Sequence, residues 1–458
     1  MSEELIISIS GMRGIIGENL TAEIATEYGC GFGTFLKDKY GGGEKELSVC
    51  IGRDSRPSGE MLREAVTSGL CSVGIDVIDL GIVTTPGVGI MLRELKCEGG
   101  IVITASHNPS QYNGIKLLLD NGIAPQAAEA EKIKSCYFAK DFSLVDEANC
   151  GRSTVNGETN DFHISKVLAI IDKDLIRQKS FHVVLDSVNG AGGVIGKKLL
   201  AELSCKVVAI NDEPTGDFAH TPEPIAENLT GLCEVVKKER AHVGFAQDPD
   251  ADRLAIVDEA GVFIGEEYTL ALAAKYIFSK QSGSAAVNLS TSRMIDDIAA
   301  KAGGRVYRTA VGEANVAGAM IEHNCVIGGE GNGGVIDLRI GPIRDSLLSI
   351  VLVLQLMAET GKSISELVGE IGSYYMRKDK FTADKAMAEQ IIGEAKKIFS
   401  DAKVDTTDGC RFDFEGGWLH LRTSNTEPIM RIIVEAKDAG IAQKYLDAVA
   451  GIRQEIVG

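Results

Sequence analysis

The sequence of 458 residues predicts an α/β protein with three tandem, similar α/β domains that contain mixed sheets, followed by a smaller C-terminal α+β domain. Two observations predict this organisation. The order strand, polar loop, helix, strand occurs three times, and each time two more strands follow. After about residue 383, helices and strands fall into separate blocks, which is typical of an α+β domain.

The repeated unit begins with an apolar strand, which leads through a polar loop and a helix of 3.6-residue apolar periodicity to a second strand. A helical crossover of this kind favours parallel pairing of the two strands. The strand–loop–helix–strand units cover residues 47–80, 181–210 and 285–307.

Each unit is followed by two strands that flank a short polar loop. The strand pairs 100–119, 242–258 and 325–338 enclose the loops 105–113, 247–252 and 328–333. Because the order of elements is the same, we expect these loops to occupy equivalent positions. The last block is predicted to contain helix 385–399, hairpin 411–422, strand 430–436 and helix 442–457. The expected domains are 1–152, 153–257, 258–374 and 375–458.

The composition excludes several classes of partner. With 47 Lys+Arg against 65 Asp+Glu the net charge is −18, and an acidic surface repels nucleic acid and anionic lipid, so we expect neither nucleic acid nor a membrane as a partner. The most apolar stretch, 347–358, is too short to span a bilayer and is predicted to be a buried core helix. An acidic N-terminal segment unlike a secretory signal, together with scattered single cysteines, predicts a cytoplasmic protein.

Three aspartates alternate in the segment Asp248-Pro-Asp250-Ala-Asp252-Arg253. Clustered carboxylates repel one another unless a cation lies among them, and oxygen ligands suit Mg²⁺ or Ca²⁺. An EF-hand calcium loop would explain Glu259 at position 12, but position 6 is Arg253 instead of glycine. A purely structural Asp-rich turn stays an alternative, and a Mg²⁺ site is the favoured interpretation.

The segment Thr104-Ala-Ser106-His107-Asn108-Pro109 follows a predicted strand. A serine beside a histidine on a tight loop is a candidate nucleophile with a neighbouring base, although the same residues also make ordinary hydrogen-bonded turns. Lys116 adds a cation on the next strand.

Two further loops have the composition of ligand-binding sites. The glycine-rich segment 328–334 contains Glu330 and Asn332, which suit the hydroxyls of a polyhydroxylated ligand. The segment 422–428 and the strand after it gather hydroxyl, amide and guanidinium donors of the kind that hold a phosphate dianion. Its candidate phosphate-binding residues are Arg422, Ser424, Asn425, Thr426 and Arg431.

These loops, together with Ser10-Gly-Met-Arg13-Gly14 and Gly52-Arg-Asp-Ser-Arg56, resemble the motifs of the α-D-phosphohexomutase family. That family includes phosphoglucomutases, phosphomannomutases and phosphoglucosamine mutases. The resemblance covers nearly the whole chain, and TASHNP followed by DPDADR carries most of its specificity. It implies that the four domains surround a central cleft.

The resemblance also implies a role for each motif. Ser106 would carry a phosphoryl group and supply one ligand to a single Mg²⁺ ion, which Asp248, Asp250 and Asp252 would also bind. Arg253 would contact the phosphoserine region, while Arg13, His107 and Lys116 would line the reacting end. Glu330 and Asn332 would hold sugar hydroxyls, and Arg422, Ser424, Asn425, Thr426 and Arg431 would hold the non-reacting phosphate.

The activity implied is that of a Mg²⁺-dependent isomerase, an intramolecular phosphotransferase that interconverts hexose 1-phosphate and hexose 6-phosphate. A phosphoserine enzyme and a hexose 1,6-bisphosphate, which also serves as activator, are the expected intermediates. The substrate is expected to be glucosamine phosphate or mannose/glucose phosphate, and the protein to be a monomer or homodimer. A metal-dependent sugar-phosphate phosphatase using the same serine, or a sugar-phosphate sensor without catalysis, is the alternative.

Two positions depart from the family pattern. Family members often carry histidine at the end of the sugar loop and after a Val-Gly pair in the third domain, where this chain has Gly334 and Glu313. These departures leave the general base open, and Lys116 and His107 are the candidates near Ser106.

Overall fold

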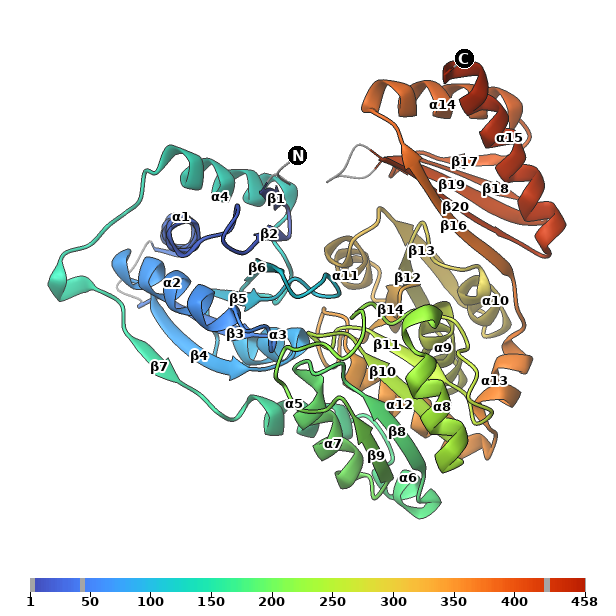
Figure 1. The fold of residues 1–458 in the computed structure, drawn as a ribbon, viewed down its shortest axis with the longest axis horizontal. Coiled ribbons are helices and arrows are strands. Elements are labelled where there is room, and N and C mark those ends of the chain that lie inside the picture. Colours follow the sequence, from blue (N-terminus) through green and yellow to red (C-terminus); the bar gives the residue numbers. More distant parts are fainter. Residues whose placement is uncertain (1–4, 42–45, 424–428, 458) are drawn as a thin grey trace.

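The computed structural model describes residues 5–41, 46–423 and 429–457. Four bodies follow one another along the chain (Figure 1). The first has a seven-stranded sheet in the order β1-β2-β6-β5-β3-β4-β7. Its elements are β1 (Ile6–Ser8), β2 (Gly11–Ile15), α1 (Ala22–Tyr40), β3 (Ser48–Arg53), α2 (Gly59–Ser72), β4 (Asp76–Ile82), α3 (Thr85–Glu94), β5 (Gly99–Ile103), β6 (Tyr112–Leu119), α4 (Ala127–Ala139), a 3₁₀ turn (Glu147–Asn149) and β7 (Ser153–Val155).

The second and third bodies each have a four-stranded sheet, ordered β11-β10-β8-β9 and β13-β12-β14-β15. The second contains α5 (Thr159–Leu168), α6 (Lys173–Lys179), β8 (His182–Asp186), α7 (Gly192–Glu202), β9 (Lys206–Ile210), a 3₁₀ turn (Ala226–Asn228), α8 (Thr230–Glu239), β10 (Val243–Gln247) and β11 (Leu254–Val257). The third contains α9 (Glu267–Lys280), β12 (Ser284–Asn288), α10 (Met294–Lys301), β13 (Arg305–Thr309), α11 (Glu313–Glu322), β14 (Ile327–Glu330), β15 (Gly334–Ile336), α12 (Ser346–Thr360) and α13 (Ile364–Ile371).

The three sheets share one core topology, as the repeated sequence pattern predicts. In each, the first strand of the unit (β3, β8 or β12) pairs in parallel with the second strand and with the third. The fourth strand (β6, β11 or β15) pairs antiparallel to the third. Mixed sheets of this kind place the three predicted loops at equivalent turns, between the third and fourth strands. The first sheet also continues past residue 152, because β7 pairs with β4.

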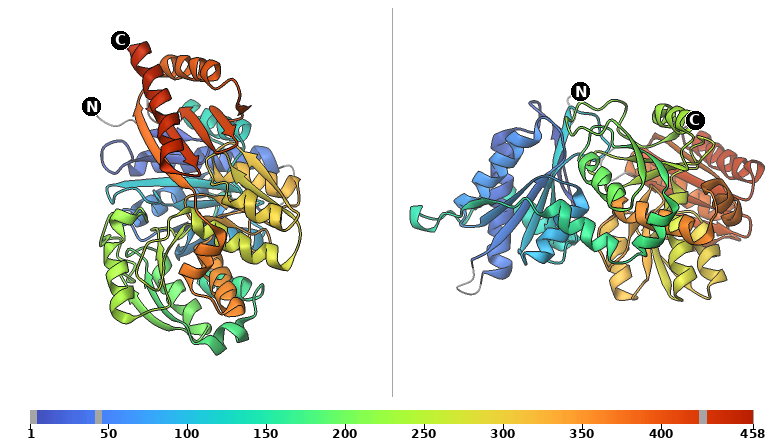
Figure 2. Two further views of the ribbon diagram at one scale, coloured as in Figure 1. Left: turned by 90° about the vertical axis from the view of Figure 1, so that its right-hand side faces the viewer. Right: turned by 90° about the horizontal axis from the view of Figure 1, so that it is seen from below.

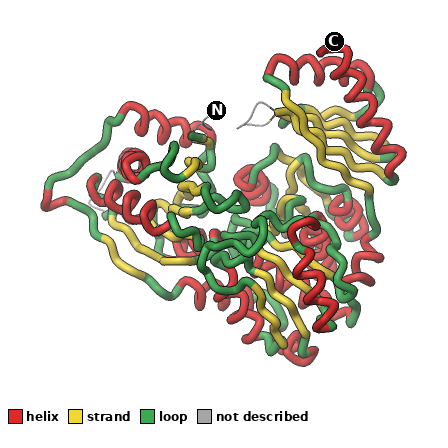
Figure 3. The backbone as a smooth tube through the Cα atoms, in the orientation of Figure 1, coloured by secondary structure: helices red, strands yellow, loops and turns green. Residues whose placement is uncertain are grey.

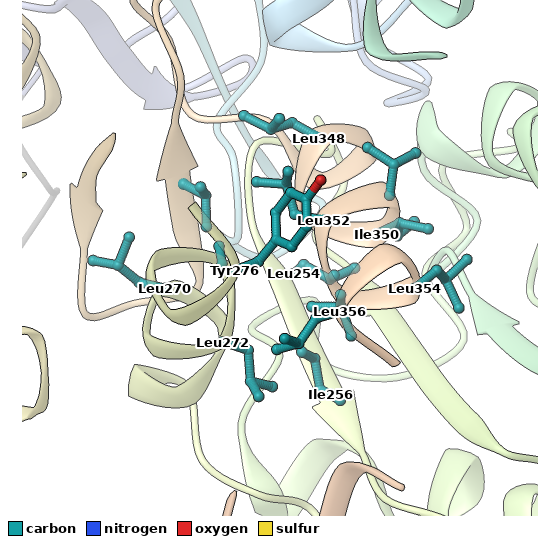
Figure 4. Packing of buried hydrophobic residues seen from close by; sticks show 14 of the residues in the cluster. Leu254, Ile256, Leu270, Leu272, Tyr276, Leu348, Ile350, Leu352, Leu354 and Leu356 are labelled. Atoms are coloured by element: carbon teal, nitrogen blue, oxygen red, sulfur yellow. The ribbon is translucent and has the colours of Figure 1, made fainter. Parts of the chain in front are cut away.

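Helix α12 joins the second and third bodies into one hydrophobic core. Its residues from Ser346 to Ala358 are all buried, and its leucines pack against β11 and α9 (Figure 4). This confirms the buried helix predicted for 347–358. Among the described helices, no single one has the length and apolar composition to cross a membrane, although α12 and α13 meet that test together as a pair bent by 91°.

The fourth body has a five-stranded antiparallel sheet in the order β16-β20-β19-β18-β17, covered on one face by two helices (Figure 2). Its elements are β16 (Tyr375–Thr382), α14 (Lys385–Ile398), β17 (Lys403–Asp405), β18 (Cys410–Phe414), β19 (Gly417–Thr423), β20 (Ile429–Ala436) and α15 (Ala439–Val457). The α+β prediction is therefore confirmed. The sequence pattern missed β16, since this edge strand is mostly exposed and its centre, Arg377 to Lys380, is charged.

The third-domain strand before the glycine loop lies later than predicted. The sequence pattern assigns a strand to 325–327 and a loop to 328–333, whereas β14 extends to Glu330. Apolar content ends at Ile327, so the pattern gives no sign that the glycines continue the strand. Gly328 fits there because a Cβ atom would lie 2.4 Å from the sulfur of Met320 and 2.8 Å from the carbonyl oxygen of Ala286.

Candidate active site

The loops after β5, β10 and β14 meet where the first three bodies join (Figure 3). Ser106 connects the first two of these loops, since its Oγ atom donates a hydrogen bond to Oδ2 of Asp248, 3.1 Å away. Ser106 has φ of 51° in the left-handed region, which requires a tightly held loop. The sequence prediction that the first two loops form one site is consistent with this contact.

Arg56 holds the serine loop in place and was not among the predicted site residues. Its buried guanidinium donates to the carbonyl oxygens of Ser106 and Asn108, both at 2.6 Å, and of Pro109 and Tyr112 at 2.7 and 2.9 Å. Its Nε also donates to Asp54 Oδ2 at 3.1 Å. Its place in Gly52-Arg-Asp-Ser-Arg56 was the only sequence signal for this role.

We predict that Arg56→Lys lowers both kcat and stability. An ammonium group has three donors and cannot reproduce the planar guanidinium contacts, so at least two loop carbonyls lose their partner. We expect kcat to fall by about tenfold to a hundredfold and the free energy of unfolding by about 3 kcal/mol, as measured by steady-state kinetics and urea unfolding. Full activity with an unchanged unfolding midpoint would contradict this role.

The three predicted aspartates form a compact cluster. Asp248, Asp250 and Asp252 are buried, and each offers a carboxylate oxygen within 4.8 Å of the others. One oxygen of Asp250 and one of Asp252 (Oδ1 in each) have no hydrogen-bond partner although they are buried. Buried carboxylate oxygens without partners are costly, and an oxygen-seeking cation would satisfy them.

Three cations partly balance the aspartates: Lys116, Arg253 and Arg344, whose Nη2 donates to Asp252 Oδ2 at 2.6 Å. Lys116 Nζ donates to Asp250 Oδ2 at 2.7 Å and lies 3.8 Å from Asp252, and Arg253 Nε lies 3.6 and 3.8 Å from Asp252 and Asp248. Thr85 Oγ1 also donates to Asp250 at 2.6 Å. Lys116 and Arg253 are predicted site residues, whereas Thr85 is not.

The pKa values of Asp248 and Asp252 are shifted in opposite directions. Burial, and then the charges of Asp252 and Asp250, raise the pKa of Asp248 well above its usual value. Burial also acts to raise the pKa of Asp252, but Arg344, Lys116 and Arg253 outweigh it and hold that pKa below its usual range. The carboxylates of the cluster therefore repel one another, and a bound divalent cation would reduce this repulsion.

Arg13 and His107 lie beside the serine. Arg13 Nη1 donates to Asn108 Oδ1 at 3.5 Å, and a ring nitrogen of His107, Nδ1, lies 3.5 Å from Ser106 Oγ. Burial, together with the positive charges of Arg253 and Arg13, lowers the pKa of His107 to about 2. Its imidazole is therefore neutral, and so low a pKa makes it a weak proton acceptor.

The glycine loop holds Glu330 and Asn332 at the same junction. Glu330 accepts hydrogen bonds from Asn288 Nδ2 at 2.8 Å and from the Gly312 amide at 3.1 Å. The Oδ1 atom of Asn332 is buried and has no hydrogen-bond partner. The loop also contacts Arg344, which the sequence analysis did not single out although it directly precedes the N-cap of α12.

The buried carboxyl group of Glu267 packs directly against Gly331 of the glycine loop. A Cβ atom on Gly331 would lie 2.0 Å from Oε2 of Glu267, which accepts the amide of Ser292 at 3.0 Å. Burial raises the pKa of Glu267 to about 8, while Lys378 lowers it by less. The carboxyl group is thus protonated in the folded protein at neutral pH.

We predict that Glu267→Gln stabilises the protein increasingly as the pH rises. The folded-state pKa lies above the ordinary value of 4.5, so the stability of the wild type is fully present below pH 4.5 and is lost as the pH rises through about 8. Glutamine does not ionise, and the expected gain at pH 8 is about 2 kcal/mol. Melting temperatures of both proteins at pH 5 and pH 8 test this, with the half-buried neighbour Glu266→Gln as control. A constant difference between the two pH values would contradict it.

Part of the predicted phosphate-binding segment lies outside the described residues, including Ser424, Asn425 and Thr426. Arg422 and Arg431 stand opposite each other on β19 and β20, and Lys380 stands opposite Arg431 on β16. Opposite residues of antiparallel strands share one face of the sheet. The same face carries His420, which pairs with Ser290 of the third body at 3.0 Å. This row of three cations adds Lys380, which the sequence analysis missed together with β16.

Comparison with known proteins gives four matched family models. They are the three alpha/beta/alpha domains of phosphoglucomutase/phosphomannomutase, over residues 5–144, 161–261 and 266–374, and the C-terminal domain of that family over 377–452. The chain is 42% identical to a phosphoglucomutase/phosphomannomutase of Thermococcus kodakarensis, over 95% of this chain and 96% of the relative. It is 36% identical to a probable phosphoglucosamine mutase of Thermococcus gammatolerans, over 98% of both chains.

A solved structure of a phosphoglucomutase/phosphomannomutase family protein from Burkholderia thailandensis superposes with a TM-score of 0.85. It is 26% identical to this chain, and the match covers 98% of this chain and 97% of that one. With four family models along the chain, two full-length relatives and a matching architecture, the chain belongs to the phosphoglucomutase/phosphomannomutase family and is a phosphohexomutase.

Proposed function

We propose that Ser106 is the residue that carries the phosphoryl group in this phosphohexomutase. The observation that carries the proposal is the contact between Ser106 Oγ and Asp248 in a cluster of three buried carboxylates. In the reaction, the O–P bond of phosphoserine breaks as the phosphoryl group passes to a free hydroxyl of a sugar monophosphate, which forms a 1,6-bisphosphate. The bisphosphate then returns its other phosphoryl group to Ser106, and the isomeric monophosphate leaves.

Asp248, Asp250 and Asp252 would hold one Mg²⁺ ion. The donor set fits, since it offers oxygen ligands only and two of its buried oxygens have no other partner. When bound, the ion would offset negative charge on the transferring phosphoryl group. Arg13 and Arg253 would contribute guanidinium charge on the same side.

Neither of the two candidate bases, Lys116 and His107, is prepared to take up a proton while the site holds no ligand. Lys116 already donates to Asp250 and keeps its protons in that ion pair, because Asp250 and Asp252 outweigh the effect of burial and raise its pKa. His107 has a neutral ring with a nitrogen 3.5 Å from Ser106 Oγ. We assign to Lys116 the stabilisation of charge, and to His107 a hydrogen bond beside the reacting hydroxyl group.

The sugar and its second phosphate would bind to the other two domains. Glu330 and Asn332 would accept and donate hydrogen bonds to sugar hydroxyls. Arg422 and Arg431, extended by Lys380, would hold the non-reacting phosphate together with Ser424, Asn425 and Thr426. The row of three cations also provides the local positive charge that a protein of net charge −18 needs for an anionic substrate.

The preferred sugar is glucosamine phosphate or mannose/glucose phosphate, since relatives of both names match the chain along its length. The test is a substrate panel of glucosamine, mannose and glucose 1-phosphates with Mg²⁺ and a trace of the matching 1,6-bisphosphate, compared as ratios of kcat/KM. Conversion of at least one sugar without release of inorganic phosphate supports the proposal. Stoichiometric phosphate release would favour the phosphatase alternative, which the relatives named above do not support. A monomeric or homodimeric state and a cytoplasmic location stay predictions from the sequence.

A further inference from the structure

One guanidinium group contacts three acidic side chains at the junction of the metal and sugar loops. Arg344 Nη2 donates to Asp252 Oδ2 at 2.6 Å, Nη1 to Glu330 Oε2 at 2.6 Å, and Nε to Glu313 Oε2 at 2.9 Å. Its side chain is 10% exposed. The three carboxylates come from the β10–β11 loop, from the end of β14 and from the start of α11, so Arg344 connects three segments.

The space for this side chain depends on a glycine. A Cβ atom on Gly334 would lie 2.1 Å from Cδ of Arg344 and 2.8 Å from its Cγ, so any other residue would force the arginine to move. Gly334 and Glu313 are also the two positions at which the family resemblance leads to an expectation of histidine. In this chain both positions adjoin Arg344. Gly334 leaves space for the arginine side chain, and Glu313 forms an ion pair with it.

Arg344 acts on the two loops in different ways. It orients Glu330, whose other partners are the side-chain amides of Asn288 and Asn332 and the Gly312 backbone amide. It also places one positive charge against Asp252, beside the carboxylate cluster. A positive charge at that place opposes the binding of a cation to the cluster, whereas the fixed geometry of Glu330 favours the binding of a sugar.

We propose that Arg344 is a positioning residue of the mutase site, which orients Glu330 toward the sugar hydroxyls and moderates the metal affinity of the cluster through Asp252. The proposal rests on the proposed roles of Asp252 and Glu330. In the proposed site Arg344 serves through its ion pairs and does not exchange a proton.

The experiment compares Arg344→Ala and Arg344→Lys with the control Arg339→Ala. Arg339 is on the same segment, but it pairs with Asp337 and is 45% exposed. Mn²⁺ binding is titrated by electron paramagnetic resonance, and KM and kcat are measured separately. We expect Arg344→Ala to bind Mn²⁺ about tenfold more tightly, since one positive charge is removed, while its KM for sugar phosphate rises by about tenfold or more.

The lysine variant separates charge from geometry. It keeps the positive charge, so we expect its Mn²⁺ affinity to stay within about twofold of wild type, but a single ammonium group does not orient three carboxylates and KM still rises. Weaker metal binding in Arg344→Ala together with a lower melting temperature would show a merely structural ion pair and overturn the proposal. Wild-type KM and metal affinity in both Arg344 variants would overturn it as well.

A second pair of variants tests the dependence on Gly334. Gly334→Ala displaces Arg344, so we expect the single variant to have a raised KM. In the double variant with Arg344→Ala, the glycine substitution should have little further effect on KM. Independent, additive effects would contradict the proposed coupling. The metal titration needs no turnover, so it tests Arg344 even if the wild type isomerises none of the sugars, a result that would count against the proposed function alone.

Discussion

Ser106→Ala is expected to abolish the mutase reaction, with kcat lower by about four orders of magnitude or more. The proposed mechanism stores the phosphoryl group on Ser106 Oγ between the two transfers, and alanine has no atom that can accept it. The protein should still fold, because the loop is held by Arg56 through backbone carbonyl groups, and the substitution removes only the hydroxyl contacts with Asp248 and His107. The expected loss of stability is within about 1.5 kcal/mol.

The measurements are the substrate panel, intact-protein mass of the resting enzyme and thermal unfolding. Wild type should carry one phosphoryl group after incubation with hexose 1,6-bisphosphate, and Ser106→Ala none. Ser110→Ala, an exposed serine four residues along the same segment, is the matched control and should behave as wild type. A phosphorylated and active Ser106→Ala variant would place the transferring group on another residue.

Much of the fold could be predicted from the sequence, because the elements that repeat are apolar strands with short, polar loops. The parallel pairing of β3 with β4, of β8 with β9 and of β12 with β13 follows from the helix that connects each pair. The contact of Ser106 with Asp248 does not follow from equivalent turns in separate domains, and only the family resemblance implied it. Edge strand β16 escapes such reasoning, since charged and exposed residues carry no apolar period.

The residues that position the site were harder to predict, because their partners are distant in the sequence. Arg56 holds carbonyl groups about 50 residues away, and Arg344 pairs with Asp252, 92 residues earlier. Arg56 lies in a recognisable motif, but nothing near Arg344 distinguishes it from a surface arginine. The structure shows that both are buried and surrounded by acceptors, Arg56 within the first body and Arg344 where the second and third bodies meet.

Asp248→Asn should have the second largest effect on activity. It should also change thermal stability in two opposite ways, with a gain in the metal-free protein and a loss of the stabilisation by Mg²⁺. In the wild type without metal, three carboxylates share one small volume, and burial and the two neighbouring charges already raise the pKa of Asp248. Asparagine removes one of the repelling groups, so the metal-free variant should unfold at the same temperature as wild type or higher. The variant also lacks one anionic ligand, so Mg²⁺ should no longer stabilise it.

Thermal unfolding with and without Mg²⁺ measures both consequences. At a Mg²⁺ concentration of about 100 times the dissociation constant, binding stabilises the wild type by about 2.7 kcal/mol, and the variant should lose most of this gain. Mutase activity should fall by about a thousandfold, since the charge on the transferring phosphoryl group is no longer offset. Asp337→Asn, a buried aspartate outside the cluster, is the control and should keep the Mg²⁺-dependent shift. If Asp248→Asn retained that shift as well, the three carboxylates would be a structural turn and the metal site would have to be sought elsewhere.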